Sequence, residues 1–131
     1  MPMEQITVFL ENQLGMLAEV AKILERENIN LQGFSITDAR GYGVLRIVVS
    51  DNEKAKKALQ EAGFTIQIAD VICVGIEDKP GQLLEILETL DSEDINIDYI
   101  YVIAGTRVVL SVPNLEKAED LLAERGFSIC K

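Results

Sequence analysis

Histidine is absent from the 131-residue sequence, and so is tryptophan. Without histidine the chain lacks the usual general base, the Ser-His and Cys-His nucleophile pairs and the commonest zinc ligand. The two cysteines, Cys73 and Cys130, form no CxxC pair, which argues against a metal carrier and against a disulfide framework. They can lie on neighbouring strands, but we expect buried free thiols, because cysteine packs as a small hydrophobe. We therefore predict that the chain is not an enzyme and has no metal site and no cofactor.

Basic and aromatic residues are also scarce. The sequence has 12 Lys and Arg against 22 Asp and Glu, a formal net charge of −10, and aromatic residues make up 5%. Nucleic-acid affinity comes largely from cations that replace counterions and from rings that stack on bases, so we expect no nucleic-acid partner. The charge disfavours anionic membranes, and no apolar run approaches the ~20 residues of a membrane span. The first residues do not resemble a signal peptide, so we expect a cytoplasmic location.

What the sequence does contain is an internal repeat. Gly15 and Gly81 occupy matching positions, and the residues around them match in the same order. These are Ile6, Val8, Glu11, Leu17, Glu19, Leu24, Ile29 and Asn30 against Ile72, Val74, Glu77, Leu83, Glu85, Leu90, Ile95 and Asn96. A second block of matches, residues 49–66 against 112–129, follows a loop that is shorter in the second copy. The pattern indicates a duplication, with domains at residues 1–68 and 69–131.

In each copy, apolar residues recur first at the spacing of a strand and then at the spacing of a helix. Residues 5–12 and 70–78 carry β-branched side chains at alternate positions, which predicts a first strand in each copy. Apolar residues at helical spacing follow, and we expect them to face the core: Leu17, Val20, Ala21 and Leu24, then Leu83, Ile86, Leu87 and Leu90. Asn28 and Asp94 mark the ends of these helices. Two more strands follow in each copy, at residues 29–31 and 44–50, then at 95–97 and 108–113.

A second helix and a last strand complete each copy. Residues 50–53 read as a capping box with Ser50 at its start, and Asn114 is the expected cap in the second copy. Gly63 and Gly126 end the two helices, and residues 64–66 and 127–129 form the last strands. The order is β-α-β-β-α-β, twice, so the fold class is α+β. Right-handed crossovers place both helices of a unit on one face of a four-stranded antiparallel sheet.

The loop before each first helix is the candidate binding site. Residues 11–15 and 77–81 lead from an apolar strand into a helix, whose N-terminal amides can receive a carboxylate. Asn12 and Asp78 can accept an ammonium group, and Asn30 and Asn96 begin the next strand. The alternative is that Asn12 and Asp78 are helix caps and that the other two are turn residues.

The segments ENQLGMLAEVAKILERENINL and EDKPGQLLEILETLDSEDINI match the motif P-G-x-L with I-N-I/L at its end, the first with leucine in place of the proline, and so resemble the ACT domain. The resemblance covers almost the whole chain and is closest to stand-alone proteins made of two ACT domains. It implies ferredoxin-like βαββαβ units that pair side by side, an expected homodimer, and an amino acid held at the interface. The residues it selects are Asn12, Leu14 (where the motif has proline), Gly15, Met16, Leu17, Asn30, Asp78, Gly81, Gln82, Leu83 and Asn96. The implied function is amino-acid-responsive regulation of a partner enzyme or regulator, and the alternative is an adaptor subunit that binds no ligand.

Overall fold

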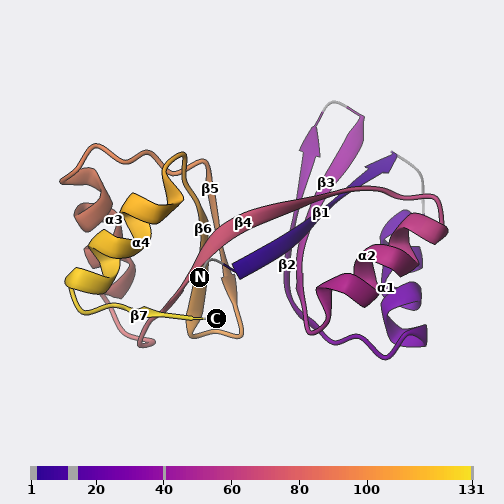
Figure 1. The fold of residues 1–131 in the computed structure, drawn as a ribbon, viewed down its shortest axis with the longest axis horizontal. Helices are drawn as coiled ribbons and strands as arrows, with labels where there is room; N and C mark the ends of the chain where they lie inside the picture. Colours follow the sequence, from indigo (N-terminus) through magenta and orange to yellow (C-terminus); the bar gives the residue numbers. More distant parts are fainter. Residues whose placement is uncertain (1–2, 12–14, 40, 131) are drawn as a thin grey trace. The chain divides into compact units, whose positions relative to one another are not determined.

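The computed structural model describes residues 3–11, 15–39 and 41–130, and within them it contains seven strands and four helices (Figure 1). Their order along the chain is β1 (Met3–Glu11), α1 (Met16–Arg26), β2 (Leu31–Ala39), β3 (Tyr42–Val49), α2 (Asn52–Glu61), β4 (Thr65–Gly75), α3 (Gln82–Asp91), β5 (Tyr99–Ile103), β6 (Arg107–Ser111), α4 (Leu115–Glu124) and β7 (Ser128–Ile129). None of these helices is long and apolar enough to cross a membrane.

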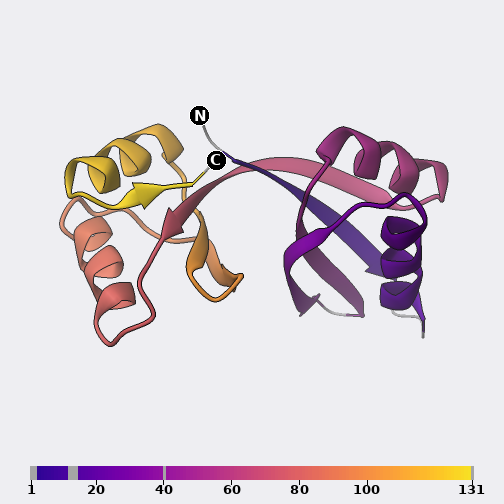
Figure 2. The same ribbon diagram turned by 90° about the horizontal axis from the view of Figure 1, so that it is seen from below.

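Two compact units divide the chain: Glu4–Ala69 forms the first, and the second begins at Asp70. In the first unit the strands lie in the order β2-β3-β1-β4, with antiparallel pairing that sets Ile47 opposite both Ile6 and Phe34. In the second unit β6 lies between β4 and β5, and β7 also pairs with β4. In each unit both helices lie on one face of the strands (Figures 1 and 2). The predicted α+β fold with two βαββαβ units is confirmed.

The strand β4 differs from the sequence-based expectation. We expected a last strand of the first copy at 64–66 and a separate first strand of the second copy at 70–78. The structure instead has one continuous strand from Thr65 to Gly75, whose first residues belong to one unit and whose last residues belong to the other. The physical reason is local, because the sequence TIQIADVICV contains no glycine or proline that would interrupt an extended backbone.

Each unit has its own apolar core between its sheet and its helix pair. In the first unit the core consists of Ile6, Val8, Leu10, Val20, Ile23, Leu24, Ile29, Leu45, Ile47, Val49, Ala55, Ala58 and Leu59. In the second it consists of Ile72, Val74, Ile86, Leu90, Ile95, Val108, Leu110, Val112, Ala118 and Leu122. Many of these side chains hold matching positions in the repeat, so the duplication preserved the core as well as the order of elements.

The buried stripe on the first helix of each unit is rotated relative to the prediction. Val20, Ile23 and Leu24 are the buried residues of α1, whereas Leu17 is 43% exposed and Ala21 is also exposed. The same rotation occurs in α3, where Ile86, Thr89 and Leu90 are buried and Leu83 is 44% exposed. The prediction was wrong for these positions because an apolar stripe wider than the core-facing side of a helix cannot be buried by one sheet. Part of the stripe therefore faces outward.

The helix boundaries confirm the predicted glycine and asparagine stops and correct one cap. Gly63 and Gly126 follow the last helical turns at φ 92° and 88°, and Asn28 adopts a left-handed conformation after α1. Asn114 caps α4 by accepting a hydrogen bond from the Lys117 N–H. The predicted cap Ser50 was wrong, however. The residue that caps α2 is Asp51, whose Oδ1 accepts from the Lys54 N–H at 3.1 Å.

These glycines yield a stability prediction. Gly126→Ala should lower the free energy of unfolding by about 1 kcal/mol, because alanine is strained at φ 88° even though an added Cβ would meet no atom within 4 Å. Gly75→Ala is the matched control, since it lies in a strand and its Cβ would make ordinary contacts with Ser128 at 3.6–3.8 Å. Urea denaturation of both variants measures the difference. Equal effects of the two substitutions would contradict the assignment of strain to Gly126.

Candidate ligand-binding site

A cavity of about 640 Å³ in the first unit lies between the start of α1 and the end of β2. Its walls are Leu10, Glu11, Gly15, Met16, Leu17, Ala18, Ile36, Thr37, Asp38 and Gly43. Three residues that the ACT resemblance selected, Gly15, Met16 and Leu17, therefore line one cavity. Ile36, Thr37 and Asp38 were not predicted from the sequence. Ile36 lies two residues after the apolar Phe34 on β2, which is the spacing of side chains on one face of a strand.

The start of α1 gives this cavity its polar end. Gly15 occupies the N-cap position in a left-handed conformation, φ 87°, and its carbonyl accepts from the Glu19 N–H at 2.9 Å. Within the described residues no side chain caps this helix. The amides of Met16, Leu17 and Ala18 have no acceptor inside the helix, because the first turn never does. They present donors and a partial positive charge that suit a carboxylate.

The remaining walls are apolar on one side and acidic at the rim. Leu10 is 4% exposed and Met16 packs against the core, whereas Ile36 is 49% exposed. Met16 is thus both a core side chain and part of the cavity wall. Glu11 and Asp38 supply carboxylates at the exposed edge, where an ammonium group would be attracted. The cavity can therefore hold both ends of a zwitterion and an apolar side chain.

Asn30, which the resemblance also selected in the first copy, does not join this group. Asn12 and Leu14 lie outside the described residues. Asn30 lines a different cavity, of about 550 Å³, beside the end of α1. Its N–H donates to Ser50 Oγ at 3.0 Å, and its carbonyl accepts from the Ser50 N–H at 3.0 Å. An 11-residue helix spans about 16 Å, so Asn30 and Gly15 sit at opposite ends of α1.

In the second unit, residues of the matching loop contact one another and the first residue of α3. The Glu77 N–H donates to Gln82 Oε1 at 3.4 Å, and Lys79 Nζ forms an ion pair with Glu77 Oε2 at 2.9 Å. The Glu77 carboxylate raises the pKa of Lys79 by hydrogen bonding and by charge attraction. Gly81 is the N-cap of α3, φ 91°, so the alternative in which Asp78 caps this helix is wrong.

Of the residues selected in this copy, Gln82 lines a cavity of about 640 Å³, which it shares with Glu77, Glu85, Arg107, Arg125 and Cys130. Asp78, Gly81, Leu83 and Asn96 are exposed. The sequence did not single out Arg107 and Arg125, which come to this wall from β6 and from the end of α4. The two copies therefore present different chemistry at matching places: an apolar wall in the first and mixed charges in the second.

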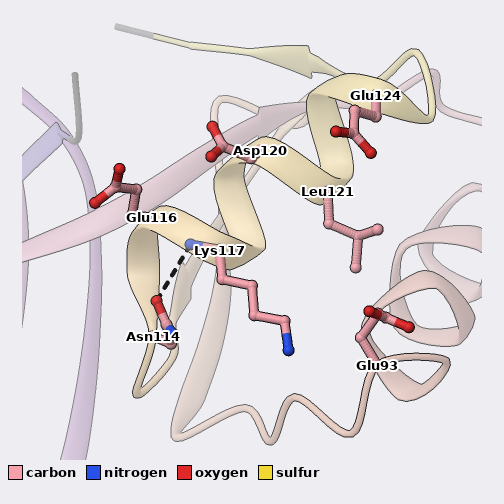
Figure 3. Close-up of a pocket in the computed structure, with 7 residues that line it drawn as sticks. All are labelled: Glu93, Asn114, Glu116, Lys117, Asp120, Leu121 and Glu124. Carbon is pink, nitrogen blue, oxygen red and sulfur yellow. Dashed lines mark hydrogen bonds between the residues drawn. The ribbon is translucent and has the colours of Figure 1, made fainter.

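Another hollow lies over α4 in the second unit and has a volume of about 430 Å³ (Figure 3). Glu116, Asp120 and Glu124 lie along the helix (Figure 3). Among the residues that the structure describes, no group of three or more histidine, cysteine or acidic side chains is placed to hold a metal ion. This hollow is a solvated acidic surface, which matches the net charge of the chain.

Both cysteines belong to the second unit and are free thiols, as expected. Cys73 is 1% exposed, whereas Cys130 is half-buried, and the Cys130 N–H donates to the Cys73 carbonyl at 2.7 Å. Burial, together with the hydrogen bond and charge of the Cys130 thiol, raises the pKa of Cys73 from 9.0 to about 12. Cys73 is therefore protonated at neutral pH.

A family model for the ACT domain pair matches residues 1–130. The chain belongs to the ACT domain pair family. The resemblance found in the two sequence segments is thereby confirmed. Among curated proteins, none matches the sequence of this ACT pair.

Solved structures include relatives over nearly the full length of this ACT pair. Protein BT0572 from Bacteroides thetaiotaomicron is 35% identical, with a TM-score of 0.93, over 99% of this chain and 92% of that one. The ligand-free regulatory subunit of aspartate kinase from Thermus thermophilus is 19% identical, with a TM-score of 0.67, over 93% and 89% of the two chains. The Thermus flavus regulatory subunit of aspartate kinase is 21% identical, with a TM-score of 0.66 over the same shares. At these identities the aspartate kinase subunits show the fold alone.

The raised pKa of Cys73 predicts an alkaline loss of stability. A thiol whose pKa is higher in the folded chain than in the unfolded chain stabilises the fold below its unfolded pKa. That contribution disappears as the pH rises from about 9 towards 12. Urea denaturation from pH 7 to 11 should therefore show the stability difference between wild type and Cys73→Ala shrinking above pH 9. Groups that do not interact with Cys73 titrate equally in both proteins and cancel, so a constant difference would contradict the shift.

Proposed function

We propose that this ACT pair is a regulatory protein that binds a free amino acid and transmits its presence to a partner enzyme or regulator. The observation that carries the proposal is the first-unit cavity, where the N-terminal amides of α1, acidic rim groups and an apolar wall meet. The fold agrees with that of solved regulatory subunits of aspartate kinase, which is the class of role proposed here. In this reading the chain has no catalytic role.

The ligand we propose has an apolar side chain. Leu10, Met16 and Ile36 would contact that side chain, and burying apolar area is worth roughly 25 cal/mol per Å². The α-carboxylate would accept from the amides at the start of α1, and the α-ammonium would face Glu11 or Asp38. A polar side chain would leave its hydrogen-bonding groups unsatisfied against this wall, at a cost of about 1–3 kcal/mol.

We further propose that the cavity is completed by a second copy of the chain. Strand β2 is an edge of its unit, and its exposed residues Phe34 and Ile36 adjoin the exposed Leu17 of α1. A groove of about 210 Å³ beside them is lined by apolar side chains alone. An open edge with apolar side chains is a template for pairing unless it is covered.

The repeat supports this inference independently. The positions that match Leu17, Phe34 and Ile36 in the second copy are Leu83, Ile100 and Val102, and all of these side chains are exposed as well. Large apolar residues kept at the surface in both copies are the expected sign of a surface that is buried in an assembly. Homodimerisation through these surfaces is therefore part of the proposal.

Antiparallel pairing of two β2 edges would also explain the position of Asn30. In such a pair the start of one strand lies opposite the end of the other. Asn30, which precedes β2, would then approach the partner's cavity, whose wall includes the end of β2 at Thr37 and Asp38. The site would draw on Gly15, Met16 and Leu17 of one chain and on Asn30 of the other. In the second copy we propose a similar use of Asp78, Gly81, Gln82, Leu83 and Asn96.

Thermal unfolding in the presence of each of the twenty amino acids tests the binding proposal. A ligand that binds the folded state alone adds about 2.7 kcal/mol of stability at a hundredfold excess over Kd. We expect the largest rise in melting temperature with an aliphatic or aromatic amino acid, and a loss of at least tenfold in affinity for Ile36→Asp. If none of the twenty shifts the melting temperature, the binding proposal fails and the adaptor alternative is favoured.

The pairing proposal predicts a coupled loss of assembly and binding. Phe34→Lys should convert a dimer to a monomer, because it places a charge on an apolar surface that must be dehydrated, and ligand affinity should fall with it. Gln60→Lys adds the same charge to an exposed position of α2 and is the matched control. Sedimentation velocity with calorimetric titration measures both effects. A monomeric wild-type chain that still binds ligand would refute the shared site and leave the amino-acid proposal standing.

A further inference from the structure

The register between β4 and β7 brings the two cysteines of the chain together. Val74 lies opposite Ile129, and Gly75 lies opposite Ser128, in an antiparallel pair. One step further along this register Cys73 lies opposite Cys130, and the Cys130 N–H donates to the Cys73 carbonyl at 2.7 Å. Residues directly opposite in a hydrogen-bonded antiparallel pair have Cα atoms about 5.5 Å apart. That spacing falls inside the range of about 4.4–6.8 Å that a disulfide spans.

The side chains of the two cysteines also meet. Opposite residues of an antiparallel pair project from the same face of the sheet. In agreement with this geometry, the side chain of Cys130 contributes to the raised pKa of Cys73. The two sulfurs differ in access, because Cys73 is 1% exposed, whereas Cys130 is half-buried and lines the cavity that contains Gln82 and Arg107.

From this juxtaposition we propose that Cys73 and Cys130 are a modification site, at which a small-molecule disulfide converts the thiol pair to an intrachain cross-strand disulfide. The proposal is independent of amino-acid binding, since it rests on the register of two strands within the second unit. Intrachain disulfides inside reducing compartments are mostly transient and redox-sensing, and a reversible pair near a surface cavity fits that use.

The exchange proceeds in two balanced steps. The Cys130 thiolate attacks one sulfur of the small disulfide, which forms a mixed disulfide and releases the first small thiol once the leaving thiolate takes up a proton. Cys73 then gives up its proton and attacks the Cys130 sulfur, which releases the second small thiol. The protein loses two protons and two electrons, and the small disulfide gains them. Cys73 acts second, because its burial denies access to an external disulfide.

The disulfide would anchor β7, the shortest strand of the second unit. β7 has two residues, and the segment that leads into it, Arg125 to Phe127, forms the cavity wall together with Ser128 and Cys130. Phe127 and Ile129 pack against the core of the unit. A covalent link from Cys130 to β4 would hold this wall in place and would reduce the freedom of the strand to detach.

The test is equilibration of the full-length, fully reduced chain with mixtures of oxidised and reduced glutathione, followed by alkylation and intact-mass spectrometry. We expect a monomeric product about 2 Da lighter than the reduced chain, with neither cysteine alkylated and full reversal by dithiothreitol. Peptide mapping should link the peptides that contain residues 73 and 130. The oxidised chain should melt at a higher temperature than the reduced chain. A chain that stays reduced, or a link between two chains, overturns the proposal.

Single substitutions separate the roles of the two cysteines. Cys73→Ser should stop at a stable glutathione adduct on Cys130, whereas Cys130→Ser should leave Cys73 reduced and slow to alkylate while the chain is folded. Cys73→Ala provides the same readout if serine at this buried position prevents folding. Wild-type protein that also stops at the glutathione adduct would show that Cys73 cannot resolve it, which overturns the proposal. No amino acid is present in these assays, so their outcome does not depend on the proposed ligand.

Discussion

The fold depends on one constraint: each sheet is covered by its helices on one face and has an edge strand that no other strand of its unit covers. Burial of Ile6, Ile47 and Leu59 between strands and helices stabilises the first unit, and Ile72, Leu110 and Leu122 do the same in the second. A unit of about 60 residues buries a smaller fraction of its surface than a larger domain does. Most of the large apolar side chains that stay exposed lie on the edge strand of a unit or on its first helix, and we propose that partners and ligands bind at these surfaces.

The repeat in the sequence was sufficient to predict the elements and the fold. Each helix, strand and helix-end pattern occurs twice, and each depends only on residues that are close together in the sequence. Asn28, Gly63 and Gly126 end helices in left-handed conformations, as their residue types predict. The cap of α2 could not be assigned, because Ser50 and Asp51 are adjacent and both are good caps. The structure decides between them through a tertiary contact, since Ser50 Oγ accepts from the Asn30 N–H instead. The continuity of β4 was missed because the last strand of one copy and the first strand of the next were predicted separately, with a few residues near Ala69 between them.

The candidate site was predictable in part. Motif spacing identified Gly15, Met16 and Leu17, because the residues of one turn before a helix are near one another in any fold. Asn30 was grouped with them by resemblance, yet α1 separates it from Gly15 in the same unit. Periodicity also placed Leu17 and Leu83 in the core, and it could not distinguish a side chain buried within a unit from one left outside. Ile36, Thr37 and Asp38 were missed because pairing of β2 with β3 determines which residues end beside the loop.

The matched exposed residues of the two copies have a consequence for symmetry. A chain with two self-associating surfaces can pair each surface with the same surface of a second molecule. It can also pair the first surface of one molecule with the second surface of the next. Like-to-like contacts are isologous and close after two molecules, whereas unlike contacts are heterologous and continue into a filament unless the rotation closes a ring. The copies differ at this surface, with Phe34 against Ile100 and Ile36 against Val102. Divergence after duplication thus gives each face a distinct shape, and shape selects between a closed particle and an open polymer.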